Sequence, residues 1–519
     1  MTPENFAAIA AEGYNHIPVT RELLADLDTP LSCYVKVANG PYSYLLESAA
    51  QGGEKWSRYS MVGLPAKKIL KVFGHEIVLE EEGVEVDRFE CTDPLEYVEQ
   101  FQLQYRYPPI EGLPIYTGGL VGYFGYDSMR YVEKRLADST PPDVIGTPDI
   151  LLMVSNDVVV FDSVKGKIHL ITHANPENTA AYQNAQERLD EMVGKMQRNI
   201  PAAVLTPEKG PVVHEEDFVS SYGEEQFTHD VDRIKDYIRE GDVMQVVLSQ
   251  RMSILFEGEP LNLYRALRSL NPSPYMYYMH LDDFHIVSSS PEILARLDNG
   301  AVTVRPLAGT RRRGRTETED LQLEAELLAD PKEIAEHLML IDLGRNDIGR
   351  ICKVGSVEVS EMMTVERYAH VMHIASNVAG AIVESGSAMD LLRATLPVGT
   401  LSGAPKVRAL EIIDEFEPEK RGIFGGAVGY LSWNGNMDTA IAIRTAVIKD
   451  HKLYIQAGAG VVADSVPALE WKETMNKARS IFQAVAMTES GLGVRDSSEN
   501  PRMSNEDEER VVVPGDASA

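Results

Sequence analysis

The 519-residue sequence predicts an α+β fold, because strand-like and helix-like segments are mixed without the regular alternation of a doubly wound sheet. A hairpin signal favours antiparallel pairing, since the runs Gly426–Trp433 and Thr439–Val447 flank the dipeptide Asn434-Gly435. The length is sufficient for two or three core-sized units.

The first part of the chain alternates short β-rich runs with turn signals. Strands are expected at Ser32–Lys36, Tyr42–Leu46, Lys68–Phe73 and Ile150–Phe161, and one helix at Thr179–Gln197. Prolines are frequent in the stretch that follows, which predicts a linker. We therefore assign 1–198 to an N-terminal domain and 199–214 to a linker.

The pattern of apolar residues in the sequence changes after the linker. Phe227, Val231 and Ile234 recur at helical spacing and Gly241 is a plausible stop, so a helix is expected there. A strand is expected at Val243–Met252. These elements begin a second domain, assigned to 215–491. The remaining residues, 492–519, are polar and acidic and are expected to form a disordered tail.

Composition excludes several classes of protein. Acidic residues outnumber basic ones 79 to 49, and a net charge of −30 repels nucleic acid. No apolar run is long enough to span a membrane, and the N-terminus lacks the pattern of a secretory signal. The three cysteines are too widely spaced for a disulfide framework or a metal motif. A cytoplasmic protein is therefore expected.

Two segments of helical periodicity, Pro331–Leu343 and Ala468–Ala486, carry acidic side chains away from their apolar stripes. These side chains are Glu333 and Glu336, with His337, on the first helix, and Glu470 and Glu473, with Lys477, on the second. The first stripe consists of Ile334, Leu338 and Ile341. Such faces are either solvated or able to hold Mg²⁺ through carboxylate oxygens. Spacing alone does not show that the two helices meet.

Further residues have two possible interpretations each. Four glycine-rich turns either bring backbone N–H groups close to an anion or are ordinary tight turns. These turns are Pro306–Thr310, Gly399–Pro405, Phe424–Tyr430 and Gln456–Gly460. Arg444 lies in the alternating run Ala440–Ala446, and its side chain either faces solvent or binds a carboxylate. His373 is a core histidine or part of a site. The residues alone leave the reaction undetermined.

Residues from about 225 to 488 resemble the chorismate-binding domain shared by anthranilate, aminodeoxychorismate, isochorismate and salicylate synthases. The matching motifs are GDVMQVVLSQR (241–251), SSSPE (288–292), RPLAGTRRRG (305–314), EHLMLIDLGRND (336–347), VMH (371–373), GTLSGAPK (399–406), GGAVGY (425–430), TAIAIRTA (439–446), QAGAG (456–460) and ETMNKAR (473–479), with LLES (45–48) in the first half. The resemblance implies the fold of the chorismate-utilising enzymes, in which antiparallel β-sheets pack in a sandwich with helices outside.

The resemblance also implies roles for single residues. Glu336 and Glu473 would bind Mg²⁺, with Glu333 and Glu470 beside them. Glu292 would protonate the departing C4 hydroxyl of chorismate, and His373 would lie near the reacting ring. The implied substrate-binding residues are Gly309, Thr310, Thr400, Phe424, Arg444, Gly458, Ala459, Gly460 and Lys477. Phe424 departs from the tyrosine usual in the family, which predicts a weaker contact with chorismate.

Two positions favour one branch of the family. Gln245 stands where the water-using members have a lysine base, which points to amination. Ala308 stands where aminodeoxychorismate synthases have a nucleophilic lysine. The resemblance thus implies the large subunit of an anthranilate synthase, a lyase that aminates chorismate at C2 and eliminates pyruvate in the first step of tryptophan biosynthesis. The alternatives are an aminodeoxychorismate synthase, a 2-amino-2-deoxyisochorismate synthase and a non-catalytic tryptophan-binding regulator.

Regulation and partners follow from the same resemblance. The sequence has no glutaminase segment, so ammonia is expected from a separate amidotransferase subunit in a hetero-oligomer, a heterotetramer. L-Tryptophan is expected as a feedback inhibitor that binds between two units of the chain. The implied tryptophan-site residues are Glu47, Ser48, Asn271, Pro274, Tyr275, Met276, Val428 and Tyr430.

Overall fold

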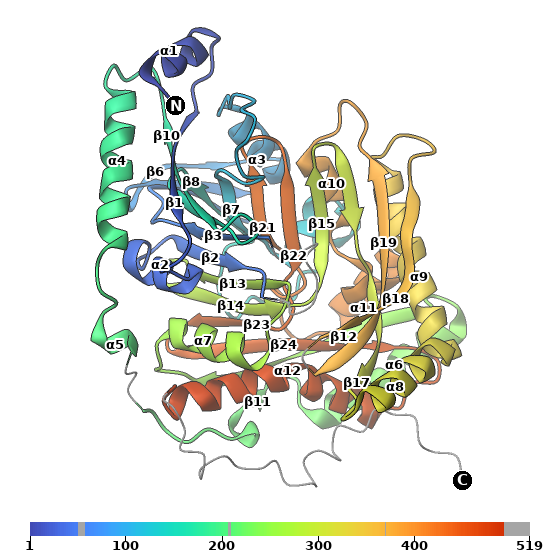
Figure 1. Cartoon of the computed structure of the whole chain (residues 1–519). Coiled ribbons are helices and arrows are strands. Elements are labelled where there is room, and N and C mark those ends of the chain that lie inside the picture. Colours follow the sequence, from blue (N-terminus) through green and yellow to red (C-terminus); the bar gives the residue numbers. More distant parts are fainter. Residues whose placement is uncertain (50–57, 206–208, 369, 493–519) are drawn as a thin grey trace.

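The computed structural model describes residues 1–49, 58–205, 209–368 and 370–492. They form two twelve-stranded sheets with helices packed around them (Figure 1). Every strand pair in this part of the chain is antiparallel, as in the pair β1 (Ile17–Leu24) and β10 (Lys167–Ala174). The predicted α+β class is therefore confirmed.

The first sheet runs β1, β10, β9 (Val158–Asp162), β3 (Tyr59–Gly63), β2 (Ser43–Glu47), β13 (Tyr275–His280), β14 (Phe284–Ser290), β23 (Thr445–Lys449), β24 (Lys452–Val461), β12 (Gln245–Leu255) and β11 (Val219–Ser220), with β20 (Gly403–Ala404) also paired to β12. The second runs β17 (Leu307–Arg312), β19 (Val371–Ala381), β16 (Ala301–Val304), β15 (Ile293–Asp298), β22 (Met437–Ile441), β21 (Ala427–Ser432), β7 (Gly119–Phe124), β8 (Ile150–Ser155), β4 (Lys68–Phe73), β5 (Glu76–Glu81) and β6 (Val84–Glu90), with β18 (Glu358–Arg367) on β19.

The α-helices are α1 (Pro3–Ala11), α2 (Pro30–Val37), α3 (Pro94–Leu103), α4 (Ala181–Met196), α5 (Ala202–Leu205), α6 (Glu224–Glu240), α7 (Pro260–Leu270), α8 (Glu317–Ala329), α9 (Pro331–Gly349), α10 (Ala388–Thr395), α11 (Lys406–Phe416) and α12 (Pro467–Glu489). Short 3₁₀ helices are η1 (Tyr126–Tyr131), η2 (Lys134–Leu136), η3 (Glu215–Asp217) and η4 (Gly399–Leu401). Among the described residues, no helix is both long and apolar enough to cross a membrane.

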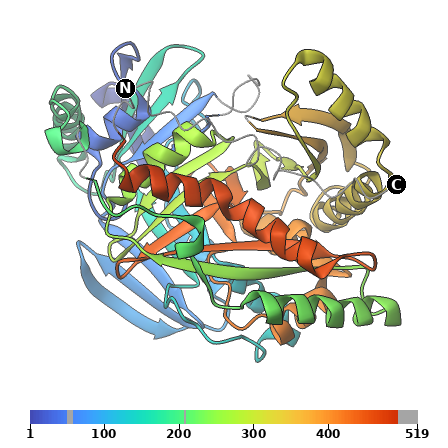
Figure 2. The ribbon, with the colours of Figure 1, turned by 90° about the horizontal axis from the view of Figure 1, so that it is seen from below.

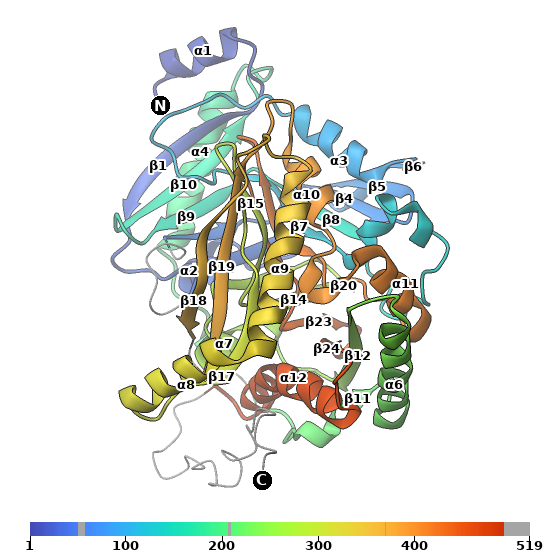
Figure 3. The ribbon, with the colours of Figure 1, turned by 90° about the vertical axis from the view of Figure 1, so that its right-hand side faces the viewer.

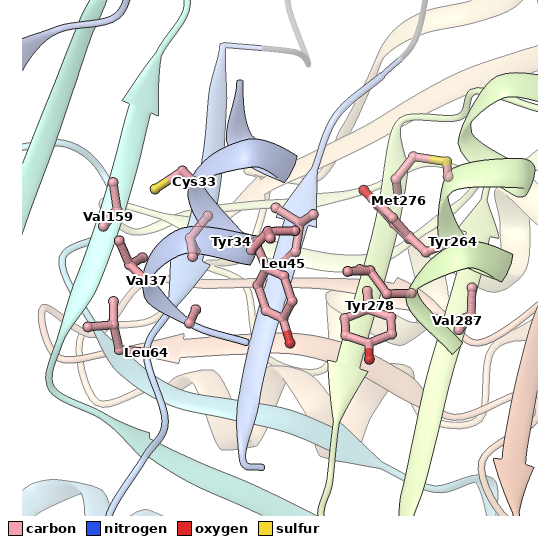
Figure 4. Packing of buried hydrophobic residues seen from close by; sticks show 14 of the residues in the cluster. Cys33, Tyr34, Val37, Leu45, Leu64, Val159, Tyr264, Met276, Tyr278 and Val287 are labelled. Carbon is pink, nitrogen blue, oxygen red and sulfur yellow. The ribbon is translucent and has the colours of Figure 1, made fainter. Parts of the chain in front are cut away.

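Both sheets contain strands from both halves of the chain. In the first sheet β2 pairs with β13, and in the second β7 pairs with β21. Figure 4 shows the resulting shared core, in which Tyr34 and Leu45 from the first half lie beside Tyr278 from the second. The linker predicted at 199–214, and with it the division into two domains, therefore remains a prediction. The tail predicted beyond 492 lies outside the described residues.

Three sequence predictions were wrong in their local structure. Ser32–Lys36 lies in helix α2, because Thr29 caps the helix and Pro30 begins it, and the buried side chains follow helical spacing. Ile150–Phe161 is not one strand, since β8 belongs to the second sheet and β9 to the first. Thr439–Val447 is broken by Arg444, whose φ of +48° ends the extended run.

The predicted helices around the site are present, but helix α9 buries a different face from the one predicted. Gly241 ends α6 in the left-handed conformation, as predicted. On α9, however, His337 is fully buried and Leu338 is 41% exposed, the reverse of the prediction. The reason is that α9 packs against β17 and β19, where the imidazole of His337 makes a 2.7 Å hydrogen bond with Ser376.

Candidate functional site

The predicted catalytic residues lie in or next to three strands: Gln245 begins β12, Glu292 precedes β15 and His373 lies in β19. The charge of Lys477 on α12 acts on both Glu292 and His373. Figure 3 shows α9 running along β19 with its lower end near β17 and α12, and Figure 2 shows α12 lying across the lower side of the molecule. Lys332 at the start of α9 acts electrostatically on Glu470 of α12. The charge at the start of α9 therefore reaches the glutamate pair of α12.

Side-chain contacts connect each helix to the neighbouring strands β12 and β24. Gln245 Nε2 lies 3.4 Å from Glu336 Oε1, and a Cβ on Gly460 would lie only 2.4 Å from the same nitrogen. On the same strand, the Gly458 carbonyl accepts a hydrogen bond of 2.9 Å from Lys477 Nζ, which pairs with Glu473 at 2.7 Å. Glu336 and Glu473 are thus both connected to the paired strands β12 and β24, Glu336 through Gln245 and Glu473 through Lys477.

Glu292 is a buried carboxyl group at the start of β15. Its Oε1 accepts hydrogen bonds from the Thr400 hydroxyl at 2.9 Å and the Leu307 N–H at 3.4 Å. Burial raises the pKa of Glu292 to about 7, although these hydrogen bonds and the charges of Arg444 and Lys477 act to lower it. The carboxyl group can therefore carry a proton near neutral pH and donate it from Oε2.

His373 is held in one protonation state. Burial lowers the pKa of its imidazole to about 4, so the ring is neutral at pH 7. Its Nδ1 lies 2.9 Å from the Gly309 carbonyl oxygen, which only accepts, so Nδ1 carries the proton. Thr310 Oγ1 lies 3.1 Å from the same nitrogen. The other ring nitrogen, Nε2, is therefore left with a lone pair that can accept a proton.

Arg444 occupies a left-handed turn between the two sheets, where its carbonyl oxygen accepts a 3.2 Å hydrogen bond from the Ser289 N–H. Burial lowers the pKa of its guanidinium group, and the charges of Glu292 and Glu473 oppose that shift. Within the described ranges, no carboxylate reaches salt-bridge distance of Arg444. A charged guanidinium of this kind is suited to a carboxylate-bearing ligand.

The two glutamate pairs have the character of a cation site. The pKa of Glu333 is raised mainly by burial and further by the charge of Glu336. The pKa of Glu470 is likewise raised by burial, with a contribution from the charge of Glu473. A divalent cation would relieve this repulsion. Over the part of the chain that is described, no three His, Cys, Asp or Glu side chains lie close enough to hold a metal by themselves. Carboxylate oxygens are the ligands that Mg²⁺ prefers, and here Glu333 pairs with Arg311 and Glu473 with Lys477.

Two predicted substrate-binding residues lie deeper than the others. Ala459 is fully buried on β24, opposite Leu248, so its side chain belongs to the core. Phe424 is also buried, and its ring lies 5.6 Å from the guanidinium carbon of Arg421.

Sequence reasoning missed a buried ion pair behind the site. Arg421 and Glu417 are almost completely inaccessible, and Arg421 also donates hydrogen bonds to the carbonyl oxygens of Leu401 and Val247. Glu417 accepts two further hydrogen bonds from Ser249. The pair therefore fixes β12 against the turn that carries Thr400. No sequence motif identifies it, because the partners are only known once these elements are packed together.

Replacing Arg421 with methionine is expected to destabilise the protein by about 3–5 kcal/mol, because the Glu417 charge would stay buried without its partner. Chemical denaturation followed by fluorescence measures the change. The matched control is Arg408→Met, which removes an exposed pair with Asp242 and should cost about 1 kcal/mol or less. Equal effects of the two substitutions would contradict the structural role of Arg421.

The residues predicted to bind tryptophan fall into two groups, one packed against α7 and the other in the core between the two sheets, where β21 of the second sheet contributes. Glu47 and Met276 are directly opposite each other on β2 and β13, and Glu47 accepts hydrogen bonds from Tyr264 and Arg268 of α7. Tyr275, Val428 and Tyr430 belong instead to the core between the sheets.

Ser48 and Asn271 lie at the edges of these groups. Ser48 follows Glu47 in the chain, and its hydroxyl is buried without a hydrogen-bond partner among the described residues. Asn271 donates a 3.3 Å hydrogen bond to Ser289, and Pro274 is partly buried in the connecting loop. An unsatisfied buried hydroxyl is unusual and marks a place where a polar ligand group would be stabilised.

Comparisons with known proteins agree with this geometry. The family model described as chorismate binding enzyme matches residues 43–483. The chain is 59% identical to anthranilate synthase component 1 of Pseudomonas aeruginosa over 95% of this chain and all of that protein, and 54% identical to the component 1 of Neisseria gonorrhoeae over 95% and 99%.

Solved structures extend the comparison to the fold. Anthranilate synthase component I from Streptococcus pneumoniae superposes with a TM-score of 0.74 at 37% identity, over 89% of this chain and 99% of that one. The menaquinone-specific isochorismate synthase of Escherichia coli shares the fold at 20% identity, with a TM-score of 0.67 over 93% and 98%. The expected fold is thus confirmed, and the chain belongs to the chorismate binding enzyme family, in its anthranilate synthase component 1 group.

Proposed function

We propose that this enzyme aminates chorismate at C2 with ammonia and then eliminates pyruvate to give anthranilate. The observation that carries the proposal is the pairing of Glu292, a buried acid with a pKa of about 7, with the cationic Arg444 and Lys477 in one site. Chorismate is a dicarboxylate with a hydroxyl leaving group, so it needs both cations and an acid. Gln245 and Ala308 support amination at C2, because neither side chain is a base or a nucleophile.

The residues suggest a sequence of proton transfers. Protonated Glu292 donates to the C4 hydroxyl, which leaves as water while ammonia forms the bond to C2. In the second step, the proton at C2 is removed and the C3–O bond breaks, so that the ring becomes aromatic. The departing enolpyruvate takes up a proton at its methylene carbon to become pyruvate. His373 is neutral with a free Nε2, and so it is suited to accept the proton from C2. Arg444 and Lys477 hold the carboxylates during both steps.

Mg²⁺ belongs to the same proposal. Glu336 and Glu473 would hold the ion, with Glu333 and Glu470 beside them. When bound, Mg²⁺ supplies positive charge that anchors and polarises a substrate carboxylate. Support comes from the raised pKa values of Glu333 and Glu470, which remain raised by burial and by a neighbouring glutamate although Arg311 acts on Glu333 and Lys332 and Lys477 act on Glu470.

A direct assay tests the proposed reaction. The purified chain is mixed with chorismate, Mg²⁺ and ammonium, and anthranilate is followed by its fluorescence and by mass analysis. Anthranilate and pyruvate in equal amounts are expected. Accumulation of the 2-amino intermediate without pyruvate would favour the enzyme that omits the lyase step. Amination at C4 would favour an aminodeoxychorismate synthase, and Ala308→Lys probes how close this site is to that chemistry.

The source of ammonia is a further part of the proposal. The relatives are named component 1, which implies a second component. We infer that a separate amidotransferase subunit supplies ammonia from glutamine within a hetero-oligomer. The isolated chain should then use ammonium but not glutamine, and addition of an amidotransferase subunit should restore glutamine-dependent activity.

L-Tryptophan is proposed as the feedback inhibitor. The support is the buried Ser48 hydroxyl, which has no hydrogen-bond partner among the described residues and follows strand β2, where the first half of the chain pairs with β13 of the second half. A ligand held between two halves can bias how they pack and thereby change the catalytic site. Tryptophan binding without any Mg²⁺-dependent turnover would instead favour the non-catalytic regulator.

Replacing Ser48 with phenylalanine is expected to raise the tryptophan concentration needed for half inhibition by about tenfold or more, which corresponds to a loss of roughly 1.4 kcal/mol in binding. The larger ring occupies the space beside the unsatisfied hydroxyl, while the turnover number should stay unchanged. Inhibition curves for the wild type, Ser48→Ala and Ser48→Phe measure the effect, with the alanine variant expected to be intermediate. Unaltered inhibition in the phenylalanine variant would exclude Ser48 from the tryptophan site.

A further inference from the structure

A small cavity lies beside Glu292 and is separate from most of the proposed substrate site. Glu292 and Thr400 line it, but Gly309, His373, Arg444 and Lys477 do not. Its walls come from α9, the η4 turn and the segment Val304–Pro306. The cavity has room for about 30 Å³ of water, and a single water molecule needs roughly 10–15 Å³ by this measure.

The far wall of the cavity carries a second buried carboxylate. Asp347 of α9 is only 4% exposed, and both of its oxygens accept hydrogen bonds from Lys406 Nζ, at 2.9 and 2.8 Å. Burial raises the pKa of Asp347, and Lys406 opposes the shift. Arg305 also lines the cavity and is paired with Glu366. Most of the other lining residues are apolar, and Glu292, Asp347, Arg305 and Thr400 provide the polar partners that an ordered water needs.

The proposed reaction creates a need for such water. In the amination step Glu292 gives its proton to the hydroxyl that leaves C4 as water, and the new C2 substituent is an ammonium group. Glu292 is then a carboxylate and must regain one proton before the next turnover. One proton is released later, when the ammonium intermediate becomes the aromatic amine, so the cycle balances. The returning proton needs a route to Glu292.

The geometry favours a route through the cavity. Glu292 Oε1 is occupied by Thr400 and Leu307, whereas Oε2 has no hydrogen bond within the described part of the chain. The charged or titratable groups that act on Glu292 or share its cavity are Arg444, Lys477, Tyr368, Arg305 and Asp347, the last paired with Lys406. Of these, Asp347 is the carboxylate that lines the cavity opposite Glu292.

We propose that water in this cavity links Glu292 to the Asp347–Lys406 pair and returns a proton to Glu292 after each turnover. The inference rests on the proposed function, since it requires Glu292 to act as the acid. Asp347 does not touch the substrate, so it is a positioning and relay residue. It would orient the cavity water and exchange protons with it.

The test is the substitution Asp347→Asn, which keeps the shape of the side chain and removes its titratable group. The turnover number should fall by about tenfold or more, while the KM for chorismate stays unchanged. Small carboxylic acids such as formate should restore part of the turnover, and bulkier acids such as pivalate should not. Asp347→Glu should retain more activity than the asparagine variant, and the solvent isotope effect on turnover should increase in Asp347→Asn.

A matched control separates relay from stability. Asp414 forms a similarly buried ion pair with Arg130, but it does not line the cavity. Asp414→Asn should lower the melting temperature without any response of turnover to formate. Normal turnover in Asp347→Asn, or a loss that no small acid restores, would overturn the relay alone. A wild-type chain that makes no anthranilate would overturn the proposed function, and the relay with it.

Discussion

Replacing Glu473 with alanine is expected to lower Mg²⁺-dependent turnover by on the order of 10³-fold, and Glu336→Ala should have an effect of similar size. The reason is that these two carboxylates are proposed to hold the cation, and loss of a metal ligand removes several kcal/mol of stabilisation of developing charge. Turnover measured against Mg²⁺ concentration should also shift to higher concentrations. Calorimetric titration of Mg²⁺ provides a reading that does not depend on activity.

The control for this prediction must remove a negative charge elsewhere. Glu326 is exposed on α8, on the helix next to α9, and it has no role in the proposed site. Glu326→Ala should therefore leave turnover and Mg²⁺ affinity unchanged. Glu470→Ala should lower turnover by about 10–100-fold, which lies between the effects of Glu326→Ala and Glu473→Ala, if the Glu470 side chain supports the ligands rather than binding the ion. Near-normal activity in both Glu336→Ala and Glu473→Ala would refute the metal assignment.

The helices of the site were predictable from the sequence because their apolar residues recur at a strong helical period. Even so, the prediction for α9 reversed the positions of His337 and Leu338. Periodicity describes the average direction of a stripe, whereas the actual buried face depends on the strands that the helix covers. Since α9 packs on β17 and β19, a hydrogen bond to Ser376 can stabilise a buried imidazole there.

The two-sheet arrangement was not predictable from local patterns. Nothing near residue 156 indicates that β8 and β9 belong to different sheets, and Arg444 interrupts an apparently regular strand. Pairing of β2 with β13 joins residues more than two hundred positions apart. Such long-range register depends on the whole fold, so single-sequence periodicity does not contain it. The family resemblance supplied the sandwich and the site residues.

Replacing Glu292 with glutamine is expected to reduce turnover by about 10²–10⁴-fold, because glutamine cannot donate a proton to the leaving hydroxyl. The pH dependence gives the sharper test. The acid must be protonated, and burial raises the pKa of Glu292 to about 7, so kcat/KM of the wild type should fall as the pH rises through about 7. His373, with a pKa of about 4, is already neutral at higher pH and adds no second change there.

A second variant tests whether the decline at high pH belongs to Glu292. Thr400 donates a hydrogen bond to Glu292 Oε1, which lowers the pKa of that carboxyl group. Thr400→Val removes the donor, so the decline of kcat/KM should move to higher pH while the acid itself remains present. In Glu292→Gln the same decline should disappear from the residual activity. If Glu292→Gln keeps the wild-type turnover and pH profile, another group must protonate the leaving hydroxyl, and the buried carboxyl is only a structural hydrogen-bond acceptor for Thr400 and Leu307.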